Sequence, residues 1–178
     1  TATLGTPCFA EAYIDGREFN VAIVAGPHGP RVLPPAEMTF QGFEDGQPKV
    51  MGYRAKWDED ADVYDKTCRT FQRGPDDAGL IRRLRRIVRR CWDLFGLKGW
   101  ARVDLRVNAA GLPFVLEINA NPCISPGAGF LAAAAQARLD PVAAVARIVS
   151  DLNVPPVRSA AVLAAATEET HEPHHQLP

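Results

Sequence analysis

Acidic and amide side chains recur at regular spacing in the segment 100–122, which reads as two short strands joined by a turn. Side chains alternate between the two faces of a strand, so Arg102 and Asp104 share one face of the first strand. By the same rule Glu117 and Asn119 share one face of the second strand. Carboxylate and amide oxygens are ligands that Mg²⁺ uses, with phosphate and water oxygens completing its shell. The segment therefore predicts a cation site, and Arg102 adds a positive charge suited to a phosphoryl oxygen or an oxyanion.

Closing the hairpin with Val107 opposite Leu112 predicts Arg102 opposite Glu117 and puts the polar side chains of both strands on one side. Asp104 then lies diagonal to Glu117, at roughly 7–8 Å between backbones. The other side is expected to be apolar and to pack on a helix, with Phe114, Leu116 and Ile118 from the second strand and Ala101, Val103 and Leu105 from the first. The simpler alternative is a solvated face with ordinary cross-strand ion pairs.

The remaining periodicities predict an α+β fold with a mainly antiparallel sheet and packed helices. Apolar residues at three- and four-residue spacing predict a helix over 76–95 that stops at Gly96. Its arginines lie mostly off the apolar face, which favours a solvated surface over a nucleic-acid site. Other expected strands cover 9–14, 18–25, 31–33 and 37–40, and other expected helices cover 126–138 and 141–152. The segment 45–70 is expected to be irregular.

Composition limits the class of protein. The 178 residues carry a formal net charge of −1 with 47% hydrophobic residues, as in an ordinary globular domain. We expect no nucleic-acid partner, no membrane span and no secretory signal, so a cytoplasmic protein with reduced cysteines is predicted. Residues 1–152 are predicted to form one domain, and residues 153–178 to form a flexible tail rich in Pro, Ala and His. A homodimer is left open.

Four motifs in this order resemble the ATP-grasp superfamily, and within it the D-alanine–D-alanine ligase family. That family carries G-x-x-R-[VI]-D and L-E-x-N-x-x-P-G, matched here by Gly99–Asp104 and Leu116–Pro122. Upstream it carries an acidic strand with G-x-E-[FL] and a Y-x-A-K segment, matched by Glu11–Phe19 and Tyr53–Lys56. The resemblance covers about two-thirds of the chain and implies the C-terminal portion of an ATP-grasp fold.

The resemblance also implies roles. Asp104, Glu117 and Asn119 would hold Mg²⁺, or Mn²⁺ in its place, against the ATP phosphates, and the catalytic Arg102 would contact phosphate or an intermediate. The remaining ATP-binding residues implied by the resemblance are Glu11, Ala12 and Ile14 at the adenine, Glu18 at the ribose hydroxyls and Lys56 at a phosphate.

The implied activity is ATP-dependent ligation of a small carboxylate to a small amine through an acyl phosphate. The alternatives are a regulatory ATP–Mg²⁺-binding module without ligase activity, and a plain scaffold without a nucleotide site. Two positions depart from the family pattern: Cys123 stands where the family has glycine, and Ala128 stands where it has a small hydroxyl residue. The second departure, at Ala128, argues for a relative with another substrate than D-alanine. The family's upstream parts do not fit before Glu11, so we expect a fragment or a site completed by another chain.

Overall fold

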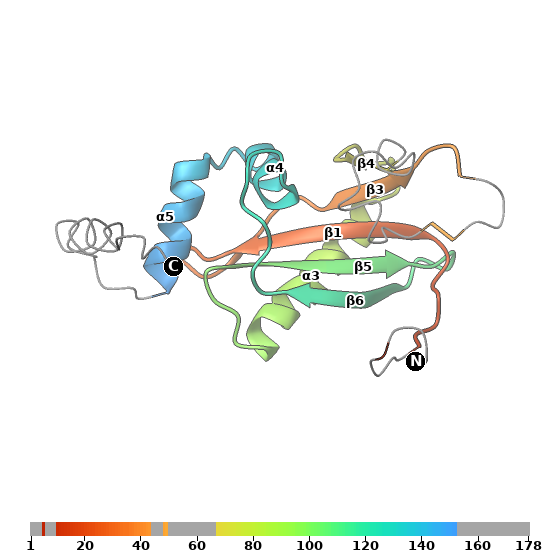
Figure 1. The fold of residues 1–178 in the computed structure, drawn as a ribbon, viewed down its shortest axis with the longest axis horizontal. Helices are drawn as coiled ribbons and strands as arrows, with labels where there is room; N and C mark the ends of the chain where they lie inside the picture. The colour runs from red at the N-terminus through yellow and green to blue at the C-terminus, as the bar shows by residue number, and fades with distance from the viewer. Residues whose placement is uncertain (1–4, 6–9, 44–47, 50–66, 153–178) are drawn as a thin grey trace, which may run out of the picture.

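The computed structural model describes residues 5, 10–43, 48–49 and 67–152. The strands of this part are β1 (Arg17–Val24), β2 (Arg31–Val32), β3 (Ala36–Phe40), β4 (Thr67–Thr70), β5 (Trp100–Val107) and β6 (Pro113–Asn119) (Figure 1). Its helices are α3 (Ala78–Leu94), α4 (Gly129–Gln136) and α5 (Pro141–Asp151).

The strands form one antiparallel sheet in the order β4-β3-β1-β5-β6, and β2 pairs with β1 off this path. The α+β class with a mainly antiparallel sheet is confirmed. Two local predictions are wrong: residues 10–14 form no strand, and β4 lies inside the segment expected to be irregular. Residues 153–178 lie outside the described part, so the predicted tail stays a prediction. None of the described helices has both the length and the apolar character needed to cross a bilayer.

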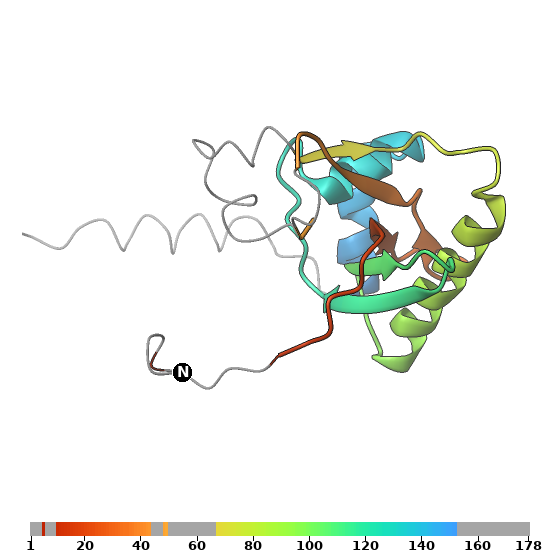
Figure 2. The ribbon, with the colours of Figure 1, turned by 90° about the vertical axis from the view of Figure 1, so that its right-hand side faces the viewer.

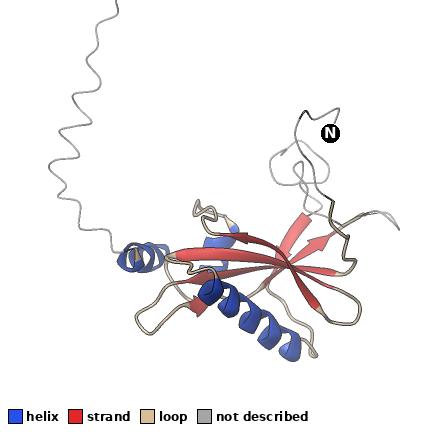
Figure 3. Ribbon diagram, turned by 90° about the horizontal axis from the view of Figure 1, so that it is seen from below, coloured by secondary structure: helices blue, strands red, loops and turns tan. Residues whose placement is uncertain are grey.

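Helix α3 covers one face of the sheet (Figure 3). Leu84 and Val88 of α3 are fully buried against the alternate residues of β1 and β5 that point toward the helix, such as Val21 and Val103. The predicted stop is confirmed, because Gly96 follows the helix with φ +59°, a conformation that glycine adopts without a steric penalty. The helix ends at Leu94, one residue before the predicted end, and Phe95 after it is 62% exposed.

Among the described residues, helices cover the opposite face of the sheet at one end. Helices α4 and α5 gather where β1 ends and β5 begins, and they bury Ala22 and Val24 with Phe130 and Ile148 (Figure 1). Asp140 caps α5 by accepting a hydrogen bond from Ala143 N at 2.9 Å. The rest of this face carries the polar side chains, and we call it the polar face. Figure 2 shows the sheet from its end, with α3 on one side.

Candidate active site

The polar face is built from facing residues of three neighbouring strands. In the β1–β5 pair Asn20 lies opposite Asp104, and in the β5–β6 pair Glu117 lies opposite Asp104. Arg102 lies opposite Asn119. Directly opposite residues of an antiparallel pair project to the same side, so the sheet brings Arg102, Asp104, Glu117 and Asn119 together on one face.

The predicted register of this hairpin is wrong. Val107 lies opposite Pro113 rather than Leu112, because the turn is one residue longer on that side: Leu112 N donates to Asn108 Oδ1 at 2.9 Å. The register then shifts again between Asp104 and Leu105. This β-bulge turns a diagonal pair of carboxylates into a directly opposed pair, which brings them closer than predicted.

The bulge also corrects which side chains of β6 are buried. Phe114 lies opposite Arg106, on the polar face, and Leu116 has no facing residue in β5. Both are exposed, whereas they were expected to pack on the helix side. Ile118 does lie on that side, opposite Val103, as expected.

Arg102 and Asp104 form the tightest ion pair of the site. Arg102 donates from Nε to Asp104 Oδ1 and from Nη2 to Oδ2, both at 2.7 Å. Burial lowers the pKa of Arg102, but the hydrogen bond and charge of Asp104, with the charges of Glu117 and Glu18, outweigh it, so the pKa is raised. Arg102 is therefore a permanent cation surrounded by three carboxylates.

Glu117 and Asn119 are more open to solvent than Asp104. Within the described residues the Glu117 carboxylate makes no hydrogen bond or ion pair, although it directly opposes a second carboxylate. Asn119 Oδ1 accepts a hydrogen bond from Asn121 N at 2.9 Å, which orients the amide at the strand end. Like charges placed opposite each other are destabilising unless a cation compensates them, so the donor set fits a divalent ion. The described residues hold no group of three or more His, Cys, Asp or Glu able to bind a metal, so an ion here would need further oxygens from water or a substrate.

A second arginine that the sequence did not single out lies beside this cluster. Arg69 of β4 donates from Nη1 to Gly127 O at 3.3 Å, and a Cβ added to Gly129 would lie 3.5 Å from Arg69 Nη2. Burial and the nearby charge of Arg102 lower the pKa of Arg69. The two cations therefore repel each other across the polar face, next to the first turn of α4. An anion between them would relieve this repulsion.

An apolar pocket of about 450 Å³ adjoins the cluster. One wall is the segment Glu11–Ile14 before β1, and the other is Phe114–Leu116 of β6, with Arg106 between them. Glu11, Ala12 and Ile14 therefore line one wall of this pocket, and their contact with adenine stays a prediction. Glu18 is buried beside the pocket and accepts a hydrogen bond from Arg106 Nη1 at 3.2 Å. Lys56 lies outside the described residues.

The loop after β6 closes the cluster on the side of α4. Trp100 Nε1 donates to Pro122 O at 2.9 Å, which ties the loop to the first residue of β5. Beyond it, Cys123 Sγ lies 3.2 Å from Ser125 Oγ, and this hydrogen bond together with that of the Ser125 backbone lowers the pKa of the exposed thiol. These contacts are local, and they show how Cys123 is accommodated where the family pattern has glycine.

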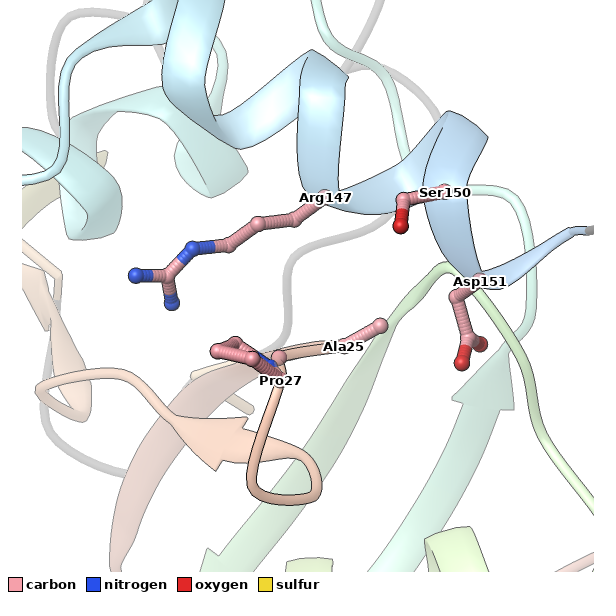
Figure 4. Close-up of a pocket in the computed structure, with 6 residues that line it drawn as sticks. Ala25, Pro27, Arg147, Ser150 and Asp151 are labelled. Atoms are coloured by element: carbon pink, nitrogen blue, oxygen red, sulfur yellow. The ribbon is translucent and has the colours of Figure 1, made fainter.

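A second cavity, of about 150 Å³, lies at the other end of β1 (Figure 4). Arg147 extends away from Ser150 and Asp151, and the loop that begins at Gly26 forms the opposite wall. Asp151 accepts a hydrogen bond from Gly99 N at 2.7 Å, which fastens the end of α5 to the start of β5. This cavity lies between α5 and the loop that follows β1, away from the acidic cluster.

Comparison with known proteins decides the family. The family model for the C-terminal part of D-ala D-ala ligase matches residues 5–150. The chain belongs to this family. A D-alanine–D-alanine ligase of Chromohalobacter salexigens is 32% identical over 141 residues, covering 79% of this chain and 40% of that protein. The corresponding ligase of Methylococcus capsulatus is 30% identical over 118 residues, covering 66% of this chain and 33% of that protein. The chain therefore spans between a third and two fifths of these two relatives.

Solved structures agree on the fold of this ligase-family chain. The D-alanine–D-alanine ligase of Bacillus anthracis matches with a TM-score of 0.59 at 22% identity, over 88% of this chain and 42% of the other. The enzyme of Coxiella burnetii matches with a TM-score of 0.60 at 16% identity, over 90% of this chain and 38% of the other. These matches show that the fold is the C-terminal portion of an ATP-grasp fold.

Three features of the ligase-family site escaped the sequence analysis, for different reasons. Arg69 lies on a four-residue strand with no clear alternation. Phe114 and Leu116 line the pocket because the β-bulge changes which way the side chains of β6 point, and the alternation of apolar residues does not predict a bulge. Arg106 did leave a signal, because it follows Arg102 and Asp104 at period two on the same face.

Proposed function

We propose that this chain supplies the ATP–Mg²⁺ site of an enzyme that joins a small carboxylate to a small amine at the expense of ATP. Family membership over residues 5–150 supports the class of activity. The observation that carries the proposal is the direct opposition of Asp104 and Glu117 on the polar face, with Arg102 bonded to one of them. Arg102 bonds Asp104 and leaves Glu117 without a hydrogen-bond or ion-pair partner among the described residues, so a further cation would complete the pair of carboxylates.

In this proposal Asp104, Glu117 and Asn119 hold Mg²⁺, with Mn²⁺ as an alternative ion. The bound ion would neutralise charge on the ATP phosphates. Arg102 would hold Asp104 in place through its two hydrogen bonds, and its remaining N–H donors would bind a phosphoryl oxygen. Arg69 adds a second cation beside it.

The apolar pocket would receive the nucleoside of ATP between Glu11–Ile14 and Phe114–Leu116. Its volume of about 450 Å³ is within the range of ligand pockets. Glu18 is proposed for the ribose hydroxyls and Lys56 for a phosphate. An ATP complex has been solved for the Bacillus anthracis ligase, which supports ATP as the nucleotide.

The proposed reaction has two steps. A substrate carboxylate attacks the γ-phosphorus of ATP and releases ADP, and the amine nitrogen then attacks the acyl carbon, forms the amide and releases phosphate and a proton. Positioning and charge neutralisation would supply most of the rate, because the protein forms no covalent bond itself. The names of the relatives make D-alanine the first acid and amine to test, and an ATP-consuming reaction of this kind fits the cytoplasm.

Calorimetry of Mg²⁺–ATP binding to the purified full-length protein tests the site. Glu117→Gln should weaken binding at least about tenfold, a loss typical even of residues that only support metal ligands. Asp93→Asn is the matched control, because this exposed carboxylate pairs with Arg89 on α3, on the far side of the sheet. Equal affinities of the wild-type protein and Glu117→Gln would overturn the site.

Phosphate release tests the activity. Release from ATP that depends on both an acid and an amine, starting with D-alanine as each, is the expected result. Mg²⁺–ATP binding without release for any pair of amino acids would instead identify a nucleotide-binding module.

A further inference from the structure

The cavity between α5 and the loop that follows β1 is lined by charged and polar side chains that the proposed function does not use. Its volume is about 150 Å³, and its lining includes Arg147, Ser150 and Asp151 of α5. These positions are three and four residues apart, so the side chains lie on one face of the helix. Residues 25–27 form the opposite wall (Figure 4).

The two opposite charges of this cavity do not pair with each other. On α3, Arg89 and Asp93 have the same order and spacing, and they form an ion pair at 3.3 Å. Arg147 instead extends away from Asp151 and makes no hydrogen bond or ion pair with a described residue (Figure 4). The cavity therefore presents a guanidinium group toward one end and a carboxylate toward the other.

Asp151 is held in place at its end of the cavity. Its Oδ2 accepts the hydrogen bond from Gly99 N at 2.7 Å, whereas its Oδ1 has no partner among the described residues. Asp151 is also the last residue of α5, where the helix dipole carries partial negative charge. The carboxylate and the dipole together favour a cation such as an ammonium group. At the other end, Arg147 favours a carboxylate, which a guanidinium group binds through two parallel hydrogen bonds.

The volume of the cavity limits the size of a ligand that carries both charges. A protein cavity of about 150 Å³ can hold a molecule as large as benzene. Glycine and alanine are of similar size or smaller, and each carries an ammonium group and a carboxylate on one carbon atom.

We propose that this cavity is a binding site for a small zwitterion, an α-amino acid no larger than alanine. Its carboxylate binds Arg147, its ammonium group binds Asp151, and the Ser150 hydroxyl, which has no hydrogen-bond partner among the described residues, supplies a further polar contact. This site is separate from the proposed ATP–Mg²⁺ site and does not depend on it.

Calorimetry on the full-length protein without nucleotide compares three probes: glycine, acetate and methylammonium. Acetate lacks the ammonium group and methylammonium lacks the carboxylate, so each keeps one of the two charged contacts. Glycine should bind at least about tenfold more tightly than either of them, as expected for one additional hydrogen bond to a charged group.

Two variants assign each contact to its residue. Arg147→Gln should weaken glycine and acetate about tenfold and leave methylammonium unchanged. Asp151→Asn, which keeps an oxygen acceptor for Gly99 N, should weaken glycine and methylammonium and leave acetate unchanged. Arg90→Gln and Asp93→Asn make the same charge changes on the exposed surface of α3, and they should leave all three affinities unchanged.

The melting temperature of each variant shows whether it is folded. Arg147→Gln removes no contact with a described residue, so it decides the question if Asp151→Asn is unstable. The inference is overturned if glycine does not bind, or if Arg147→Gln binds glycine as tightly as the wild-type protein, because the amino acid would then lie elsewhere. Acetate binding as tight as glycine binding would overturn it as well, since the cavity would then take a simple anion.

Discussion

At the residue scale, two clusters of ion-paired side chains lie on opposite faces of the sheet, one around Arg17 and one around Arg102. Arg17 bonds both Glu37 and Asp77, with contacts of 2.7 and 2.6 Å, and its guanidinium carbon lies 5.0 Å from the Phe19 ring centroid. This cluster joins β1, β3 and the start of α3. Arg102 and Asp104 form the comparable pair of the polar face, but there a second carboxylate, Glu117, has no hydrogen-bond or ion-pair partner among the described residues.

The Arg17 cluster predicts how stability responds to acid. The hydrogen bond from Arg17, with that from Gly74 N, lowers the pKa of Asp77 from 3.8 to about 2. The ionised form is thus favoured by folding, so its contribution is full above pH 3.8 and is lost as the pH falls through about 2. Asp77→Asn should lower the free energy of unfolding at pH 7 by about 1–3 kcal/mol.

Urea unfolding of both proteins between pH 7 and pH 2 measures this. The gap between wild type and Asp77→Asn should be constant from pH 7 to pH 4.5 and shrink below pH 3.8. A gap that stays constant down to pH 2 would show that the carboxylate is not held ionised by folding.

Arg69 carries the second residue-scale prediction. Arg69→Gln removes one of two mutually repelling cations, so it should weaken Mg²⁺–ATP binding about three- to tenfold and reduce the dependence of binding on salt. Arg86→Gln changes the same charge on the exposed surface of α3 and serves as control. Calorimetry at two salt concentrations checks both effects, and an unchanged affinity for Arg69→Gln would exclude Arg69 from the phosphate site.

At the element scale, the entry into β1 is the most constrained turn next to the pocket. Gly16 has φ +139°, and a Cβ added there would lie 2.0 Å from Val107 O at the end of β5. Gly16→Ala should therefore cost about 3 kcal/mol or more, from strain and a backbone clash together. Gly79, in the first turn of α3, has open space around it, and Gly79→Ala should raise stability by about 0.5–1 kcal/mol.

Chemical denaturation of the two alanine variants tests the contrast directly. A stable Gly16→Ala protein would mean that the turn can move away from β5. In that case Arg106 would lose its acceptor at Gly16 O, and nucleotide binding should weaken even though the fold survives.

Elements with strong local signals were predictable from the sequence, and the geometry between elements was not. The helical periodicity of α3 and the alternation in β5 predicted these elements correctly. In each of them the buried apolar residues lie on one face, so the sequence pattern is clear. Alternation also predicted that Asp104 and Glu117 share a face. It could not predict the β-bulge that places the two carboxylates directly opposite each other. A bulge is a property of the pairing between two strands, and the pattern of a single strand does not encode it.

At the scale of the whole molecule, one sheet separates two cores with different tasks. The core under α3 contains Leu84 and Val88 and supports the sheet from behind, whereas the core under α4 and α5 contains Phe130 and lies beside the polar face. Helix α4 begins at Gly129, beside Arg69, so the second core also positions part of the proposed site. Stability and binding should therefore respond differently to damage in the two cores.

Two truncations separate these tasks. Leu84→Ala should cost about 2–5 kcal/mol of unfolding free energy, and Phe130→Ala about 3–5 kcal/mol. Leu84→Ala should keep the wild-type affinity for Mg²⁺–ATP when measured well below its melting temperature, because the sheet between α3 and the site is intact. Phe130→Ala should weaken binding, because α4 can shift and carry Gly127 and Gly129 away from Arg69. Urea unfolding gives the stabilities and calorimetry gives the affinities. Equal loss of affinity in both variants would mean that the site depends on overall stability rather than on the placement of α4.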